Sequence, residues 1–418
     1  MVDAREIHTT CVFARAPAGN SSGAPFEGWR CALKASLAIA APSFRGSSET
    51  FIRAHVRTVA PGTTVLLCED GHDSERLGCP VLSHLAAYPR PRSLLERVGN
   101  GLRFRWRYRI DPALRGRAEK RVRAFLDAYR PTAVLAEYGP MGCRLRVACG
   151  RADVPLFVHF HGADATKLGE RRFWRRHYRK LFRDAAGVIV PSRFLADRMR
   201  ALGCADAKLH VSPNGVDPTQ FRPSRREPGR VLAVGRLVEK KGPLLTIKAF
   251  ARVCSSIEDA TLDIVGDGPL RERCIKLVRA EGLERAVTFH GVQPPERIVE
   301  LLSRAALFAQ HSVTAPNGDA ESFGISLAEA QAAEVPVVAT DHNGFRETIA
   351  DGETGILVPE HDVDSMAGAM IALLRDPDRT AAMGRAGRER VLAHFTQDRT
   401  AARLREIMAL DVAHEIAA

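Results

Sequence analysis

The chain has 418 residues, of which 45% are hydrophobic and 26% are charged, and its formal net charge is +12. This length exceeds what one ordinary hydrophobic core organises, so we expect two domains in a globular protein. No apolar run approaches the roughly 20 residues that cross a bilayer, which argues against an integral membrane protein. Residues 1–30 carry Asp3, Glu6 and Glu27 and lack the apolar stretch of a signal peptide. They are rich in Gly, Ala, Ser and Pro around residues 17–28, so we expect a loosely ordered extension.

The 9 cysteines are scattered along the chain and include no C-x-x-C pair. Their spacing matches neither a zinc site nor a disulfide framework. We therefore expect reduced thiols and a cytoplasmic protein.

Strands that alternate with helices characterise the first half of the chain. The apolar segment Leu33 to Ala41 predicts a strand, and a loop containing Gly46 then leads into a helix over residues 48–59. Further buried strands are expected at residues 63–68, 133–136, 156–160 and 187–191. Together these elements predict an N-terminal domain over residues 31–217.

The same rhythm restarts after residues 218–229, which are rich in proline and arginine and which we interpret as a linker. Strands are expected at residues 231–234, 261–265, 287–290, 307–309 and 335–340. They predict a second domain over residues 230–392, followed by a C-terminal helix, residues 393–418, that packs back on the first domain. The fold class is therefore α/β, with two doubly wound Rossmann-like domains that hold ligands in the cleft between them, at the carboxyl ends of their strands.

The positive charge gathers in two clusters in the first half, Arg90 to Arg123 and Arg171 to Arg183. Basic residues interleaved with aromatic ones can bind anionic lipid head groups, each contributing about 1 kcal/mol near the surface. A solvated basic face explains the clusters equally well. Binding of nucleic acid phosphates is the third reading, and we give it the least weight.

A buried strand ends at Gly235 and is followed by Arg236, Lys241 and a glycine that opens a helix. Arginine and lysine beside a helix N-terminus suit a diphosphate. The alternative is a surface loop whose cations pair with Glu239 and its neighbours.

Another strand ends in His161-Gly162-Ala163-Asp164. Its position at the carboxyl end of a strand makes His161 a candidate ligand contact, although a lone histidine at a strand end is more often structural. Asp164 either orients this histidine or caps the next helix.

Two glutamates, Glu321 and Glu329, bracket a turn that opens an alanine-rich helix. A carboxylate among alanines costs several kcal/mol if it is buried without a partner, so Glu329 either faces water or holds a ligand. Backbone N–H groups of the Ser322-Phe323-Gly324 turn point ahead of the helix and suit a negative charge. The two carboxylates need not touch, so they need not form an acid/base dyad.

Several short motifs occur in the order of one known family. They are Val190 to Ser192, Pro213 to Asp217, Gly235-Arg236 with Lys241-Gly242, Val265 to Pro269, Glu321 with Glu329, Asn343 to Glu347, and Asp351 to Val358. Together they resemble the retaining nucleotide-sugar glycosyltransferases of family 4, which have the GT-B fold. Within that family the chain is similar to bacterial exopolysaccharide enzymes such as those of colanic acid synthesis.

The resemblance implies a nucleoside diphosphate sugar as the donor, linked to UDP or GDP. Arg236 and Lys241 would bind the diphosphate, Gly46 would approach the phosphate, and Glu329 would hold the ribose hydroxyls. It implies a polysaccharide or lipid-linked glycan as the acceptor. Because the two arginine clusters lie in the N-terminal domain, which is the acceptor side in this fold, we expect them to dock the enzyme on the inner membrane face.

The resemblance also implies how the sugar is held and transferred. Glu321 and His161 would face the transferring sugar, helped by the backbone of Phe323, Gly324 and Ile325. Transfer would keep the anomeric configuration by front-face attack. No cofactor and no metal are expected, and the two Asp-x-Asp triplets, at Asp362 and Asp376, are expected to be helix caps.

Two features depart from the family pattern. Ser322 stands where the family has glycine, and the preceding stretch Thr314 to Asp319 is longer and more polar. The alternatives are a nucleotide-sugar 2-epimerase of the same architecture, a basic nucleic-acid-binding protein, and an inactive scaffold that binds no nucleotide.

Overall fold

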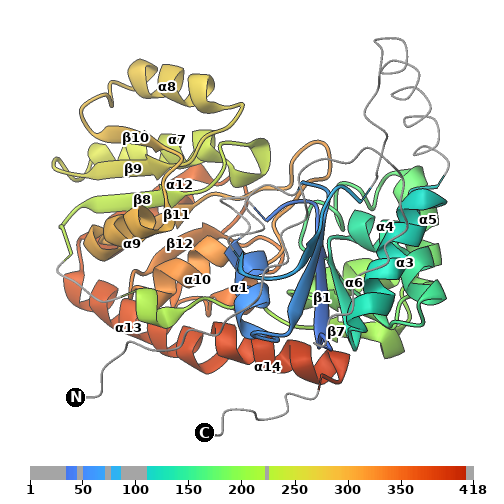
Figure 1. Cartoon of the computed structure of the whole chain (residues 1–418). Coiled ribbons are helices and arrows are strands. Elements are labelled where there is room, and N and C mark those ends of the chain that lie inside the picture. Colours follow the sequence, from blue (N-terminus) through green and yellow to red (C-terminus); the bar gives the residue numbers. More distant parts are fainter. Residues whose placement is uncertain (1–33, 45–49, 71–76, 86–110, 222–225, 411–418) are drawn as a thin grey trace, which may run out of the picture.

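Two parallel β-sheets, each packed against helices, lie side by side in the computed structural model, which describes residues 34–44, 50–70, 77–85, 111–221 and 226–410 (Figure 1). The first sheet has 7 strands in the order β3-β2-β1-β4-β5-β6-β7, and the second has 6 strands in the order β10-β9-β8-β11-β12-β13. Both orders reverse direction at the first strand of their domain, and ligand crevices lie at such switch points. The expected α/β fold with two Rossmann-like domains is confirmed.

The N-terminal domain alternates strands and helices along the chain. Its strands are β1 (Leu37–Ala41), β2 (Thr64–Cys68), β3 (Val81–Leu82), β4 (Ala133–Glu137), β5 (Leu156–His159), β6 (Gly187–Val190) and β7 (Leu209–Val211). Its helices are α1 (Thr50–Thr58), α3 (Arg117–Tyr129), α4 (Gly139–Arg151), α5 (Arg172–Asp184) and α6 (Arg193–Ala201).

The C-terminal domain repeats this plan. Its strands are β8 (Arg230–Val234), β9 (Thr261–Val265), β10 (Val287–Gly291), β11 (Leu307–Gln310), β12 (Val337–Thr340) and β13 (Gly355–Val358). Its helices are α7 (Pro243–Cys254), α8 (Arg271–Ala280), α9 (Pro295–Arg304), α10 (Ile325–Ala332), α11 (Phe345–Thr348), α12 (Val363–Leu374) and α13 (Pro377–His394), followed by α14 (Gln397–Met408).

The long buried strands lie close to where their apolar runs predicted them, but some boundaries differ. The first strand begins at Leu37 rather than Leu33, and the strand expected at residues 335–340 begins at Val337. The expectations omitted β3, β7 and β13, which are edge strands of two to four residues. Such short strands show no hydrophobic period of their own.

The last helix returns to the N-terminal domain after α13 has packed along the C-terminal domain (Figure 1). Leu404 and Met408 of α14 join the same buried cluster as Ile39 of β1 and Ile52 of α1. Arg405 donates hydrogen bonds to the carbonyl oxygens of Thr58 and Val59, where α1 ends. Helix α14 therefore fixes the position of α1, which forms one wall of the interdomain cleft described below.

The connection between the domains begins with the 3₁₀ turn Pro218–Gln220. Phe221 is buried in the core beneath α10, and Val216 forms a parallel bridge with Thr396. The expected loop residue Gly46 lies outside the described residues. Across the described part of the chain, no helix is both long and apolar enough to span a membrane.

We expect Gly384→Ala to lower the free energy of unfolding by about 2 kcal/mol or more, because the new methyl group overpacks the interface between α13 and the turn after α10. A Cβ at Gly384 would lie 2.0 Å from the carbonyl oxygen of Glu334. Gly368→Ala in α12 is the matched control, since a Cβ there meets no atom within 4 Å. It should stabilise the helix by up to about 1 kcal/mol. Urea unfolding of both variants measures this, and equal midpoints would contradict it.

Candidate active site

A cleft of about 1200 Å³ lies between the two domains and is lined from both. The N-terminal domain contributes α1, the start of α4 and the loop after β5, and the C-terminal domain contributes the loop after β8 and the start of α10. The sequence-predicted residues that line it are His161, Arg236, Lys241, Glu321, Phe323, Gly324, Ile325 and Glu329. The structure thus brings together every described residue that the sequence singled out for the site.

The loop after β8 holds Arg236 at the cleft through close backbone packing. Leu237 N–H donates to the Asp267 carbonyl at 2.9 Å, and a Cβ on Gly266 would lie 2.0 Å from the Gly235 oxygen. Gly266 also has a φ of 128°, so it must be glycine for two reasons. The motif from Val265 to Pro269 therefore supports the Arg236 loop, and the Arg236 side chain is exposed on the cleft wall.

Glu321 is held by two lysines. Lys241 Nζ lies 3.2 Å from Glu321 Oε2, and Lys240 Nζ lies 3.2 Å from Oε1 and 3.0 Å from Oδ1 of Asp319. Burial by itself raises the pKa of Glu321, but the two ammonium groups overcome this and lower the pKa to about 2. Glu321 is therefore an anion at every physiological pH.

Sequence reasoning selected Lys241 and missed Lys240, which is 6% exposed. The sequence shows two adjacent lysines, but no local pattern indicates that one of them is buried, because a lysine is almost never fully buried unless it is paired. The polar stretch before Glu321, which departs from the family pattern, supplies Asp319 as the second partner of Lys240.

The backbone of Glu321 is held by the segment after β12. His342 Nε2 accepts from Glu321 N–H at 3.1 Å, and Asn343 donates to the Glu321 carbonyl at 3.2 Å. A Cβ on Gly344 would lie 1.8 Å from the Ser322 oxygen, so only glycine fits there. The motif that begins at Asn343 therefore positions the Glu321 loop.

Glu329 faces the cleft from α10 with partial exposure. Burial raises the pKa of its carboxyl to about 7, and the charge of Lys241 offsets only part of that effect. We expected Glu329 either to face water or to hold a ligand. Its side chain borders the cleft but is not freely solvated, so neither expectation describes it fully. A carboxyl in this setting is ready to accept hydrogen bonds from a ligand.

His161 lies on the cleft wall, but one of its ring nitrogens points into its own domain. Nε2 lies 2.7 Å from Oε2 of the buried Glu137. Asp164 neither contacts the ring nor caps the next helix: its carboxylate accepts from the N–H groups of His161 at 3.1 Å and Gly162 at 3.0 Å, and from that of Gly139, the first residue of α4, at 3.0 Å. Asp164 therefore shapes the backbone of the loop.

The two domains are joined across the cleft by hydrogen bonds. The Ser322 hydroxyl donates to the His161 carbonyl, and the Glu347 carboxylate accepts from the first amides of α6, Arg193 at 3.0 Å and Phe194 at 3.2 Å. Ser322, where the family has glycine, thus makes an interdomain contact. These bonds hold Glu321 and His161 on facing walls.

Two side-chain groups bear on metal binding. Asp362 and Asp376, which begin the Asp-x-Asp triplets, accept from Ser365 N–H and Arg379 N–H as N-caps of α12 and α13. Both triplets are helix caps, as expected. Among the described residues, His55, Glu137 and His159 form the group whose ligand atoms lie close enough together to hold an ion.

Comparison with known families matches both halves of the chain. Residues 65–220 match the model "Glycosyltransferase Family 4", and residues 218–390 match "Glycosyl transferases group 1". The boundary between the two matches falls at the interdomain connection.

Curated relatives have the same class of activity in their names. A putative colanic acid biosynthesis glycosyltransferase of Escherichia coli K12 is 31% identical over 277 residues, which span 64% of this chain and 68% of the relative. A GDP-mannose-dependent phosphatidylinositol monomannoside mannosyltransferase of Mycolicibacterium smegmatis is 32% identical over 289 residues, 66% of this chain and 74% of the relative.

Among solved structures, the Anabaena protein HepE in complex with UDP and glucose has a TM-score of 0.73 at 19% identity and covers 90% of this chain and 99% of its own. This likeness supports the GT-B arrangement of the two domains. The family resemblance and the enzyme class expected from the sequence are thereby confirmed. The chain belongs to the GT-B glycosyltransferases that join a family 4 domain to a group 1 domain.

Proposed function

We propose that this glycosyltransferase moves a sugar from a UDP- or GDP-linked donor to a polysaccharide or lipid-linked glycan acceptor, with retention and without a metal. The observation that carries the proposal is the arrangement of Lys241, Glu321 and Glu329 on one wall of the interdomain cleft. A cation, an anion and an ionisable carboxyl lie on this wall, and these groups suit a diphosphate, sugar hydroxyls and ribose hydroxyls respectively.

The donor diphosphate would contact Arg236, Lys241 and the start of α10. Arg236 offers a fork of N–H donors, Lys241 a point charge, and the helix N-terminus about half a positive charge. Together they offset the negative charge that develops on the leaving diphosphate. In other transferases a metal ion neutralises this charge. The use of both Asp-x-Asp triplets as helix caps supports this proposal.

Transfer would occur on one face of the sugar. The acceptor oxygen forms a bond to the anomeric carbon as the bond from that carbon to the diphosphate oxygen breaks, and the acceptor proton passes to the leaving diphosphate. Glu321 would not donate that proton, because its pKa is held at about 2. Its carboxylate would instead accept from sugar hydroxyls and orient the ring.

The relatives support a nucleotide sugar donor without choosing the base. The mycobacterial relative is named for GDP-mannose, and HepE was solved with UDP. Colanic acid biosynthesis appears in the name of the Escherichia coli relative. We therefore propose a role in exopolysaccharide or glycolipid assembly.

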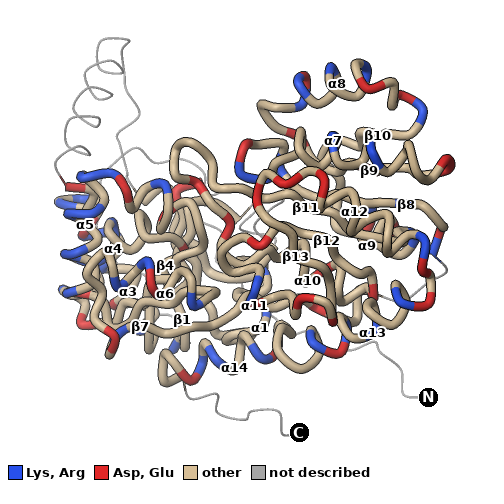
Figure 2. The backbone as a smooth tube through the Cα atoms, turned by 180° about the vertical axis from the view of Figure 1, so that it is seen from behind, with Lys and Arg blue, Asp and Glu red and all other residues tan. Residues whose placement is uncertain are grey.

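A basic surface on the N-terminal domain supports docking at an anionic membrane. Helix α5 exposes Arg172, Arg175, Arg176, Arg179 and Arg183, and lysine and arginine crowd this helix in Figure 2. Arg115 of the first basic cluster lines one hollow with Arg172 and Arg176 of the second. The part of the first cluster from Arg90 to Ile110 lies outside the described residues. We propose a cytoplasmic enzyme that meets its lipid-linked acceptor at the inner membrane face.

Product analysis tests the proposal directly. The purified chain would be incubated with UDP- and GDP-sugars, with and without a lipid-linked glycan, in the presence of EDTA. We expect acceptor-dependent release of nucleoside diphosphate and a product whose anomeric configuration, seen by NMR, matches that of the donor. Conversion of the donor sugar without acceptor would favour the 2-epimerase, and inversion or loss of activity in EDTA would contradict the proposal.

We expect Lys241→Ala to weaken UDP or GDP binding about 10- to 100-fold, the usual effect of losing one charge-assisted hydrogen bond. The fold should persist, because Lys240 still pairs with Glu321. Lys248→Ala, an exposed lysine on α7, is the matched control. Isothermal titration calorimetry measures both, and equal affinities for the two variants would remove Lys241 from the diphosphate site.

We expect Glu329→Gln to stabilise the protein above pH 7 while weakening nucleotide binding. The folded pKa of about 7 lies above the usual 4.5, so the stability linked to the bound proton is present at low pH and is lost as pH rises through 7. Glutamine carries no charge, so the gain at pH 8 should be on the order of 1 to 3 kcal/mol and should shrink toward pH 5. Melting curves and UDP titrations at both pH values measure this. A gain that does not depend on pH would refute the role of the charge.

We expect the double substitution Arg172→Glu and Arg176→Glu to reduce flotation with vesicles that contain anionic lipid. Two charge reversals remove about 2 to 4 kcal/mol of surface attraction at low salt. Lys276→Glu with Arg279→Glu on α8 makes the same change in net charge on the C-terminal domain and should leave flotation intact. If both double variants lose flotation equally, net charge rather than this face attracts the membrane.

A further inference from the structure

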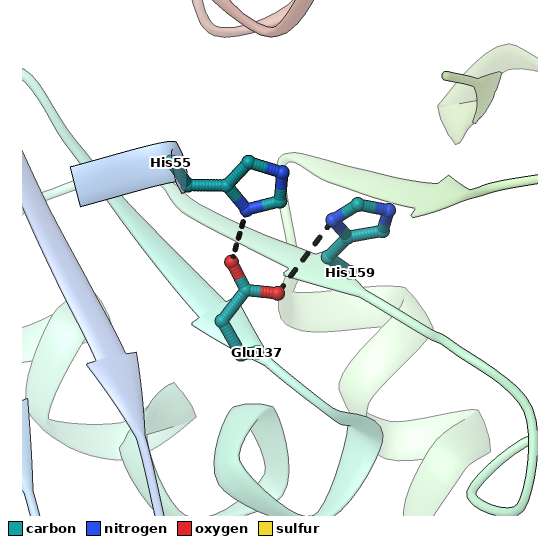
Figure 3. A group of neighbouring side chains, drawn as sticks. All are labelled: His55, Glu137 and His159. Carbon is teal, nitrogen blue, oxygen red and sulfur yellow. Dashed lines mark hydrogen bonds and ion pairs between the residues drawn. The ribbon is translucent and has the colours of Figure 1, made fainter. Parts of the chain in front are cut away.

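A buried carboxylate surrounded by histidines lies just behind the cleft wall. Glu137 ends β4, His55 comes from α1, His159 ends β5, and His161 follows two residues later; Figure 3 shows the first three converging. Glu137 and His159 are fully buried, and His55 is 3% exposed. The helix and the two strand ends thus meet at one anionic group.

Two of the contacts in this cluster are hydrogen bonds. His55 Nδ1 lies 2.8 Å from Glu137 Oε1, and His161 Nε2 lies 2.7 Å from Oε2, so each imidazole N–H donates to one carboxylate oxygen. This assigns the proton-bearing nitrogen of both rings, Nδ1 in His55 and Nε2 in His161. The carboxylate therefore fixes the orientation of both histidines at once.

The distances between the histidine nitrogens and the Glu137 oxygens favour direct hydrogen bonds over a metal ion bound between these groups. Ligand atoms around a tetrahedral zinc, with bonds of about 2.0 to 2.2 Å, lie more than 3 Å from one another. The two short contacts are closer than that, and His159 Nδ1 lies 3.6 Å from Glu137, beyond hydrogen-bond reach. Burial lowers the pKa of His159 well below its usual range, so this ring is a neutral neighbour that stacks against His55.

The charge on Glu137 is held in place by its partners. Burial alone raises the pKa of this carboxyl, but His55 and His161 lower it well below its usual range. A buried carboxylate that loses a hydrogen-bonding partner costs several kcal/mol, so the two histidines are under strong constraint. The cluster is therefore a rigid connection rather than a loose contact.

This connection joins the two walls of the cleft. Helix α1 lines the cleft through Phe51 and Ala54, and the Phe51 ring lies 4.3 Å from the His161 ring. The His161 carbonyl accepts from the Ser322 hydroxyl, and Ser322 directly follows Glu321. The path runs from α1 through His55 and Glu137 to His161, and across the domain interface to the Glu321 loop.

We propose that His55 and Glu137 are positioning residues for sugar transfer, which hold His161 and the α1 wall in register with the Glu321 loop. The inference rests on the proposed function, because it assumes that the acceptor lies between these walls. Neither residue touches the nucleotide side of the cleft formed by Arg236, Lys241 and Glu329. Their loss should therefore slow transfer and leave nucleotide binding unchanged.

Glu137→Gln tests this with little change of volume. We expect kcat for sugar transfer to fall about 10- to 100-fold, as displacement of reacting groups by an ångström does, with the affinity for UDP or GDP unchanged. His55→Gln should act in the same direction. Glu119→Gln is the matched control, because Glu119 is a buried carboxylate of the same domain, paired with Arg151 at 2.9 Å and away from the cleft. It should keep wild-type kcat.

Histidine ¹⁵N NMR of the intact wild-type chain supplies a readout independent of activity. We expect the proton on Nδ1 of His55 and on Nε2 of His161, and both patterns should change in Glu137→Gln. Metal analysis of the same sample should find no stoichiometric zinc.

Several outcomes would overturn the inference. They are equal kcat values for Glu137→Gln and Glu119→Gln, a loss of nucleotide affinity in Glu137→Gln, the opposite tautomers in the wild type, or one equivalent of zinc that disappears in Glu137→Gln. Failure of the proposed function looks different, since the wild-type chain itself would then bind no nucleotide or transfer no sugar.

Discussion

The largely buried charge on Glu321 is the constraint on which the C-terminal wall of the cleft depends. An anion removed from water is costly unless cations and hydrogen bonds replace its hydration. Here Lys240 and Lys241 supply the cations, and both come from the turn between β8 and α7. Because the ion pairs join that turn to the loop before α10, the Arg236 loop, the start of α10 and Glu329 keep fixed relative positions.

The N-terminal domain also stabilises a carboxylate that is removed from water, but it uses different partner groups. Glu137 is also a buried carboxylate, but its partners are two imidazoles rather than two ammonium groups. The two acidic centres approach each other at the domain interface, where the Ser322 hydroxyl donates to the His161 carbonyl. One centre is paired to two lysine ammonium groups, and the other accepts hydrogen bonds from two imidazole rings. Each wall of the cleft is therefore anchored by a carboxylate with two side-chain partners.

Basic residues occupy two different parts of the molecule. Lys240, Lys241 and Arg236 line the interdomain cleft, whereas the arginines of α5 lie on the outer face of the N-terminal domain (Figure 2). Interactions between exposed charges are largely screened beyond a Debye length, about 10 Å at moderate salt, so each group acts mainly on what lies close to it.

The sequence by itself determined the alternation of strands and helices, the two domains and a set of charged residues and loop residues that line the cleft. Buried parallel strands must be continuously apolar, and the residues that follow them must gather at one edge of the sheet, so Arg236, His161 and Glu321 could be found from local patterns. Lys240, Glu137 and His55 could not, because nothing local separates a buried charge from a solvated one. Lys240 pairs with Asp319, which is 79 residues away along the chain, and Glu137 pairs with His55 and His161, which are 82 and 24 residues away. Only the tertiary structure brings these partners into contact. The structure also decided the charge state of the two glutamates that bracket the turn before α10. Two lysines lower the pKa of Glu321 to about 2, so it stays charged, whereas burial raises the pKa of Glu329 to about 7.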